Sequence, residues 1–181
     1  MENYPKIVTK KTIFDSKFLN LYEIKLKLRN GNIKIHYNVE RVPTVTVLPL
    51  SENYEVYLIS QYRYLYGTTR IEAVAGTIDK EEKPLATAKR ELLEEAGITA
   101  KKWQEIGQIY LAGSYIKAHV SIFLARELTI GKANLEDDET ITLITMPLDE
   151  AVQKVLTGEI TYGSAVSGIL LLDRLKRDRK I

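Results

Sequence analysis

The sequence of 181 residues contains no cysteine, which excludes disulfide bonds, zinc–thiolate sites and cysteine nucleophiles. Histidine is almost as scarce, and the two that are present, His36 and His119, argue against a histidine-rich metal site. No apolar run approaches the roughly 20 residues that a membrane-spanning helix needs. The first residues, MENYPKIVTKK, also lack the apolar core of a signal peptide. We therefore expect no membrane association and a cytoplasmic location.

Neither sign of charge is in large excess, because 26 Lys and Arg face 24 Asp and Glu, for a net charge of +2. Proteins that bind nucleic acid mainly through its phosphates usually carry a clear basic surplus, so we expect no nucleic-acid partner. Hydrophobic residues make up 45% and charged residues 28% of the chain, as in ordinary globular proteins. The length suits one main domain and leaves room for a small appendage.

Alternation of apolar and polar residues predicts a hairpin from residues 18–29 and 33–42, which flank the turn Asn30-Gly31-Asn32. Further strands are expected at residues 45–50, 54–62, 105–112, 120–126 and 140–146. Helices are expected at residues 84–96, 148–157 and 164–176. This order predicts an α/β (α+β) fold with a mixed central sheet between helices.

Residues 84–96 form the clearest predicted helix, because Pro84 suits the first helical position and Gly97 the residue just after the end. Leu85, Ala88, Leu92 and Ala96 recur at helical spacing and should face the core.

Three glutamates of this helix, Glu91, Glu94 and Glu95, share one helical face. Carboxylates this close repel one another unless a positive charge lies between them, and Mg²⁺ prefers such oxygen ligands. Arg90 lies four residues before Glu94 and can hold its carboxylate in one rotamer. The triplet alone also fits an exposed acidic helix, so the surrounding residues have to decide.

The whole segment, GTIDKEEKPLATAKRELLEEAGI, resembles the Nudix box, and every specified position is filled at the right spacing. The matching residues are Gly76, Glu82, Arg90, Glu91, Leu92, Glu94, Glu95, Gly97 and Ile98. A chance match has a probability on the order of 10⁻¹⁰ per register.

The resemblance implies an α/β/α sandwich that hydrolyses a nucleoside diphosphate linked to another moiety, with Mg²⁺ or Mn²⁺ as cofactor. By position, Glu91 and Glu95 resemble the principal metal ligands and Glu94 an assisting ligand with a catalytic role. The main-chain carbonyl of Ala75 or of Gly76 completes the implied metal site. Arg90, with Glu82, resembles the residues that hold the loop and helix of the box together.

Two flanking segments resemble the ADP-ribose pyrophosphatase branch of the family. Gln61-Tyr62-Arg63 resembles its QYR segment, and residues 72–79 (EAVAGTID) resemble its E-x-P-A-G-x-I-D stretch with Val74 in place of proline. These matches imply that Tyr62, Arg63 and Glu72 bind substrate. Arg63 can bind phosphate oxygens bidentately. Tyr62, Tyr64 and Tyr66 alternate as on a strand and could stack on adenine, although core or interface packing is the more common role of such residues.

One loop departs from this branch, because Gly113-Ser114 replaces the usual Pro-Gly pair and Ala118 stands where an acidic residue is common. The leading hypothesis is Mg²⁺-dependent hydrolysis of ADP-ribose to AMP and ribose 5-phosphate. Another nucleoside diphosphate sugar or a dinucleotide is the alternative that the loop favours. A non-catalytic nucleotide sensor is the third hypothesis.

Two expectations concern segments outside the box. The acidic stretch 135–139 precedes a predicted strand, and by resemblance Glu139 is the catalytic base, with Glu136 as the second candidate. Residues 1–42 form a predicted β extension that precedes the Nudix domain at 43–181. Relatives that resemble this chain dimerise through such an extension, so a homodimer is expected.

Overall fold

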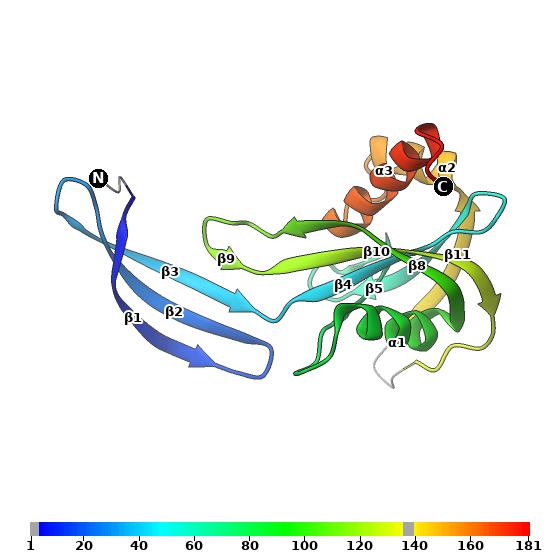
Figure 1. Cartoon of the computed structure of the whole chain (residues 1–181). Helices are drawn as coiled ribbons and strands as arrows, with labels where there is room; N and C mark the ends of the chain where they lie inside the picture. The colour runs from blue at the N-terminus through cyan, green and yellow to red at the C-terminus, as the bar shows by residue number, and fades with distance from the viewer. Residues whose placement is uncertain (1–3, 136–139) are drawn as a thin grey trace. The chain divides into compact units, whose positions relative to one another are not determined.

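The computed structural model describes residues 4–135 and 140–181. The chain divides into two compact units (Figure 1). Unit 1 comprises Met1–Pro43 and Tyr110–His119, and unit 2 comprises Thr44–Ile109 and Val120–Ile181. The sequence had placed the first boundary at residue 42, but it had not assigned the second segment, Tyr110–His119, to the N-terminal part.

Unit 1 contains a four-stranded sheet with the order β1-β2-β3-β9. Its strands are β1 (Lys6–Asp15), β2 (Leu19–Lys27), β3 (Ile33–Arg41) and β9 (Ile116–Lys117). The predicted hairpin is confirmed as β2 and β3, which pair antiparallel from Leu19 opposite Arg41 to Lys27 opposite Ile33. Strand β1, which the sequence pattern did not predict, lies at the edge of the sheet and is exposed along its whole length.

Unit 2 contains two sheets, with the orders β7-β4-β10-β8 and β11-β5-β6. The strands are β4 (Thr44–Pro49), β5 (Glu55–Arg63), β6 (Thr68–Glu72), β7 (Val74–Thr77), β8 (Ile98–Tyr110), β10 (His119–Ile130) and β11 (Ile141–Pro147). The first sheet is mixed, because β4 pairs parallel with β10 and antiparallel with β7. The sequence predicted a single sheet here, whereas the structure has two sheets.

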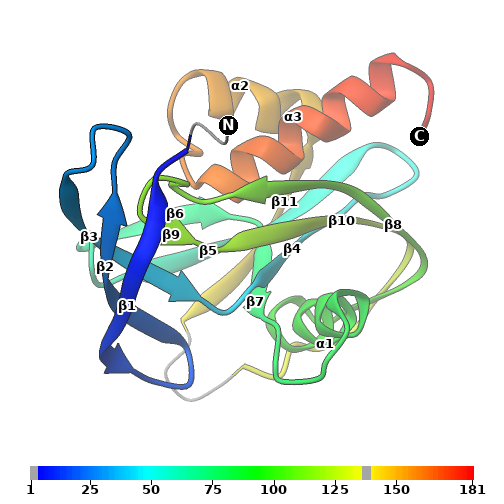
Figure 2. The ribbon, with the colours of Figure 1, turned by 60° about the vertical axis from the view of Figure 1, so that its left-hand side comes forward.

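Three helices cover this layer: α1 (Pro84–Ala96), α2 (Leu148–Leu156) and α3 (Gly163–Arg177). Helix α1 lies on one side of the strands, and α2 and α3 lie on the other (Figures 1 and 2). Each side has its own apolar core, with Ala88 and Leu92 of α1 in one and Ala151 and Ile169 of α2 and α3 in the other. The predicted α/β/α sandwich is confirmed. Among the described residues, no helix combines the length and apolar content that crossing a bilayer requires.

Two local expectations were wrong. Leu85 shares the helical stripe of Ala88 and Leu92, but it lies in the first turn of α1, outside the core cluster, and is 38% exposed. Tyr64 and Tyr66 do not continue β5, because the chain turns after Arg63, where Tyr66 N–H donates to the Arg63 carbonyl (2.9 Å). Their rings are exposed, which excludes core packing within this chain.

Candidate active site

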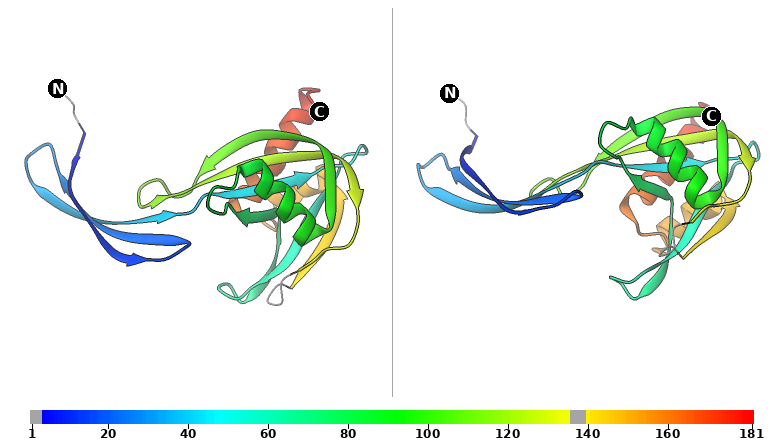
Figure 3. Two further views of the ribbon diagram at one scale, coloured as in Figure 1. Left: turned by 60° about the horizontal axis from the view of Figure 1, so that its bottom comes forward. Right: turned by 90° about the horizontal axis from the view of Figure 1, so that it is seen from below.

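The glutamate helix α1 is positioned by its two ends and by β7. It begins with Pro84 at the first helical position, where no backbone N–H is needed. It ends at Gly97, whose φ of 65° lies in the left-handed region and whose N–H bonds to the last turn. Helix α1 packs along one face of the strand layer (Figure 3). Its glutamate face therefore lies next to the backbone of β7.

The Glu91 side chain lies directly against the backbone of β7 at Gly76. A Cβ atom at Gly76 would overlap the carboxyl end of Glu91, so only glycine leaves room for that carboxylate in its present position. Gly76 is itself held opposite Val45 of β4. The box glycine thus places the Glu91 carboxylate directly on the strand.

Glu95 is almost completely buried, with 8% of its surface exposed. Its Oε2 accepts a hydrogen bond from the backbone N–H of Ala75 at 3.1 Å. A charge at this depth is costly unless it is hydrogen-bonded or paired, and the Ala75 N–H supplies part of that compensation. The bond also holds the end of α1 against β7.

Arg90 contacts three carboxylates of the segment, those of Glu82, Glu91 and Glu94. Its Nη1 lies 2.7 Å from Glu91 Oε1 and donates to Glu94 Oε2 at 2.9 Å. Its Nε and Nη2 face Glu82 at 3.4 and 3.3 Å, and Nη2 also donates to the Thr77 carbonyl at 3.3 Å. One guanidinium therefore links the loop before α1 to the glutamate face.

The ionisation of Arg90 follows from this arrangement. Partial burial by itself lowers the pKa of the Arg90 guanidinium. The surrounding carboxylates outweigh burial and raise that pKa above its ordinary value. Arg90 therefore stays charged at any pH at which the protein is folded.

A second ion pair brings together Arg63 at the end of β5 and Glu72 at the end of β6. Arg63 Nε and Nη2 donate to the two oxygens of Glu72 at 2.8 and 2.7 Å. Glu72 is 1% exposed, and its hydrogen bonds raise the pKa of Arg63. Glu95 contributes to the same electrostatic field, and the Arg63 guanidinium lies 5.7 Å from the centre of the Tyr162 ring. Arg63 is thus held rigidly near the glutamate helix.

Comparison with known proteins settles the family. A family model described as "NUDIX domain" matches residues 40–164, which is well over half of the chain. The chain belongs to the Nudix family. It is 32% identical to an ADP-ribose pyrophosphatase of Bacillus subtilis over 157 residues, covering 86% of this chain and 85% of that protein. It is 30% identical to an ADP-ribose pyrophosphatase of Mycobacterium tuberculosis over 166 residues, covering 90% and 80%.

A solved structure described as an ADP compounds hydrolase shares the fold, with a TM-score of 0.84 and 22% identity over 98% of this chain and 97% of that one. The Nudix assignment agrees with the strand–loop–helix unit formed by β7 and α1. The chain is therefore a Nudix hydrolase by family, as its sequence predicted.

The donor set of this Nudix box fits a hard divalent cation, because every candidate ligand is a carboxylate or carbonyl oxygen. In the described ranges, however, no three acidic or histidine side chains already converge as metal ligands. Glu91 and Glu94 instead both point to Arg90 Nη1. Metal binding by the Ala75 carbonyl and by Glu91, Glu94 and Glu95 therefore stays a prediction.

Of the other predicted site residues, the structure describes Tyr62 but not Glu136 or Glu139. Tyr62 lies on β5 next to Arg63 and is 53% exposed. Glu139 and Glu136 lie outside the described residues. Tyr162, which precedes α3, is a neighbour of Arg63 that sequence reasoning missed, because no local pattern links residues so far apart in the chain.

The loop that departs from the ADP-ribose pyrophosphatase pattern lines a pocket in unit 1. The pocket has a volume of about 600 Å³. Gly113 and Ala118 line it together with Arg41, Tyr110 and His119. The His119 and Tyr110 rings lie 6.1 Å apart. The change in sequence therefore falls on residues that shape a cavity.

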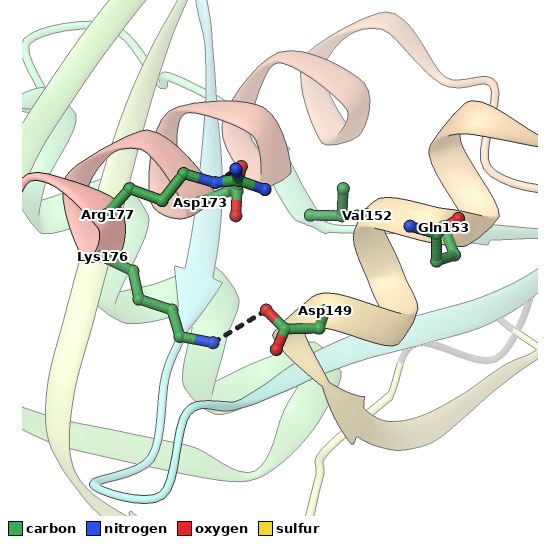
Figure 4. Close-up of a pocket in the computed structure, with 6 residues that line it drawn as sticks. All are labelled: Asp149, Val152, Gln153, Asp173, Lys176 and Arg177. Carbon is green, nitrogen blue, oxygen red and sulfur yellow. Dashed lines mark hydrogen bonds and ion pairs between the residues drawn. The ribbon is translucent and has the colours of Figure 1, made fainter.

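A different groove, of about 420 Å³, lies between α2 and α3 (Figure 4). Its charges are already paired, with Lys176 Nζ 2.8 Å from Asp149 Oδ1 and Arg177 Nε 2.9 Å from Asp173 Oδ2. It lies on the opposite side of the strand layer from α1 (Figure 2). We assign it no role in the Nudix site.

The fit of Glu91 on Gly76 leads to a prediction for Gly76→Ala. The new methyl group should displace the flexible end of Glu91 rather than the backbone, so the fold should survive while the carboxylate moves. We expect kcat/KM to fall at least about tenfold, since small displacements of catalytic groups have large effects. Steady-state hydrolysis measures the change in kcat/KM, and thermal melting checks that the fold survives.

Gly163→Ala is the matched control, because a Cβ there would meet no atom within 4 Å. It should leave activity unchanged. Equal activities of the two variants would show that the position of the Glu91 carboxylate is unimportant.

Proposed function

We propose that this Nudix hydrolase cleaves the diphosphate of a nucleoside diphosphate sugar, and that ADP-ribose is hydrolysed to AMP and ribose 5-phosphate. The observation that carries the proposal is the carboxylate face of α1, gathered by Arg90 beside β7. The names of the two bacterial relatives at 30–32% identity support ADP-ribose as the substrate. Nothing in this proposal requires nucleic acid or a membrane, and we propose that the protein is cytoplasmic.

We assign the metal-binding role to the Nudix box. Glu91, Glu94, Glu95 and the main-chain carbonyl of Ala75 would hold Mg²⁺, or Mn²⁺, whose charge would neutralise the diphosphate when bound. Arg90 limits the rotamers of Glu91 and Glu94, and in this way it prepares the ligand face.

The remaining residues would bind and activate the reactants. Arg63 would donate to a phosphate oxygen while Glu72 keeps its guanidinium in place. Tyr62, with an exposed ring, would contact the substrate beside Arg63. Glu139 would accept the proton of the attacking water, which is the role of a general base. The bond between phosphorus and the bridging oxygen then breaks, and the two products are phosphomonoesters.

A hydrolysis panel tests the reaction. Purified protein is incubated with ADP-ribose, ADP-glucose, GDP-mannose and a dinucleoside polyphosphate, each with Mg²⁺, with Mn²⁺ and without metal, and phosphomonoester release is measured. We expect the highest kcat/KM for ADP-ribose, and only with metal. A higher value for another compound would favour the alternative substrate class suggested by the loop 113–118. Release from none of them would favour a nucleotide sensor.

We also propose that two chains associate through the sheet of unit 1. Its strands expose several large apolar side chains, including Ile7, Phe14, Ile33, Ile35 and Tyr37. Ile33, Ile35 and Tyr37 alternate along β3 and so share one face of the sheet. This apolar face of β3, which the charged Glu23, Lys25 and Lys27 of β2 flank, is typical of a surface that a partner covers. A second copy of the chain is the partner we propose.

The association predicts a solution mass of twice the 20.6 kDa chain at micromolar concentration. Ile35→Glu should shift the mass toward the monomer, because it puts a charge in the centre of the apolar face. Leu156→Glu, at an exposed apolar residue of α2, is the control and should leave the dimer intact. Light scattering after gel filtration measures all three, and a fully active wild-type monomer would refute the dimer.

A further inference from the structure

A basic pocket in unit 2 is used by none of the roles above. It has a volume of about 490 Å³, in the range of small-molecule sites. Four cationic side chains line it, Lys101, Lys102, Arg126 and Lys180, and no acidic side chain does. The only tryptophan of the chain, Trp103, also lines it. Four cations around one pocket are notable in a chain whose net charge is only +2.

Two of these cations are partly neutralised from outside the pocket. Lys102 Nζ lies 2.5 Å from Glu127, and Arg126 Nη2 lies 3.2 Å from Glu52, which is itself mostly exposed. Exposed pairs of this kind are screened by solvent and contribute little. The cationic side chains that line the pocket are therefore only partly neutralised by these two pairs.

The remaining donors of the pocket, on Lys180, Lys101 and Arg126, have distant acceptors or none in the part of the chain that the structure describes. Lys180 Nζ is 4.0 Å from Asp178, and Lys101 has no ion pair within 4 Å in the part of the chain that the structure describes. Arg126 Nε is buried and has no hydrogen-bond partner among the same residues. The main-chain oxygen of Ile181, at the same pocket, accepts a hydrogen bond from Tyr54 (3.0 Å). A buried donor without an acceptor is costly, and an anion beside this guanidinium would offset part of that cost.

The pocket is separate from the Nudix site. Ala75 lies opposite Thr46 on β4, and Thr46 lies opposite Ile122 on β10. Arg126 is four residues further along β10, which corresponds to about 13 Å along the strand. Lys101 belongs to β8, one strand further from β7. A ligand bound at Lys101 and Arg126 would therefore not be the group held by the glutamates.

We propose that this pocket binds the phosphate group of a small anion. Phosphate offers three acceptor oxygens and up to two negative charges, so it can accept from more than one of the cationic side chains that line the pocket, Lys101 and Lys180 among them. A carboxylate has two oxygens and one charge and matches this set less well. Inorganic phosphate and a phosphate monoester share this chemistry, and the experiment distinguishes them.

Trp103 provides the readout, because it is the only tryptophan in the sequence and it lines this pocket. Metal-free protein is titrated at constant ionic strength with inorganic phosphate, with ribose 5-phosphate and with ribose, and calorimetry provides a second readout. We expect saturable binding of both phosphates and none of ribose. Tighter binding of the ester than of inorganic phosphate identifies a monoester as the ligand, and equal binding identifies phosphate alone.

The variant pair Lys101→Ala with Lys180→Ala should weaken the binding at least about tenfold, which corresponds to about 1.4 kcal/mol. Lys27→Ala with Lys34→Ala, on exposed strands of unit 1, is the charge-matched control and should bind as the wild type does. Absence of saturable binding, or equal affinity in both variant pairs, would overturn the proposal. Hydrolysis should be unchanged in the pocket variant, so this outcome does not depend on the proposed reaction.

Discussion

Replacing Glu95 by glutamine should lower kcat at least about 10²-fold, the scale of a lost electrostatic contribution to the transition state. Glutamine keeps the shape of the side chain, and its amide oxygen can still accept the Ala75 N–H that now bonds Glu95 Oε2. The substitution removes only the negative charge that we assign to metal binding. Because the position is nearly buried, water cannot readily replace the lost ligand.

Glu105→Gln is the control for this experiment, since Glu105 is an exposed glutamate of β8 and should tolerate the same change. Hydrolysis is measured over a range of Mg²⁺ concentrations, and thermal melting checks the fold. A Glu95→Gln enzyme with near-normal kcat at saturating Mg²⁺ would remove Glu95 from the metal site.

Replacing Glu139 by glutamine should lower kcat by about 10²–10⁴-fold, the usual contribution of a general base. The reason is chemical, because carboxylates that bind a cation are poor bases and another acidic group has to take the proton of water. KM should change much less than kcat, since the substitution removes a function of the transition state rather than ground-state binding. The Mg²⁺ concentration for half-maximal rate should stay the same if Glu139 is only the base.

Glu136→Gln is the neighbouring control and should have a small effect. If it abolishes kcat while Glu139→Gln stays within about threefold of the wild type, the base is Glu136 and our choice is wrong. If both variants are fully active, the base lies elsewhere in the chain. Rates measured with ADP-ribose and with the best alternative compound keep this result independent of substrate choice.

Local sequence signals were sufficient for much of the fold and for the glutamate helix. Helix α1 has the predicted bounds, Pro84–Ala96, because proline and glycine act on the backbone of their own turn. The β2–β3 hairpin follows from alternation and a glycine turn in the same way. The order of strands and helices also predicted the layered sandwich, since each amphipathic element needs a covered face.

Local patterns were insufficient where a strand is short or exposed. Strand β1 is exposed throughout and so carries little of the alternation that burial imposes. Strands β7 and β9 have four and two residues, too few to show a period. The turn after Arg63 has a local sequence signal, because Gly67 follows the run of tyrosines. In the structure Gly67 adopts a φ of 62°, which glycine accommodates easily.

The family, the layered fold and the carboxylate face of α1 could therefore be predicted from the sequence, because they depend on spacing within single elements. The groups that restrain that face are visible only in the folded chain. They are Arg90 between Glu91 and Glu94, the Ala75 N–H on Glu95, and the contact at Gly76. The tertiary structure alone also paired Arg63 with the buried Glu72 and collected the basic pocket from β8, β10 and the chain after α3. The physical reason is that such contacts join residues distant in the chain through strand pairing and burial, which leave no periodic trace in the sequence.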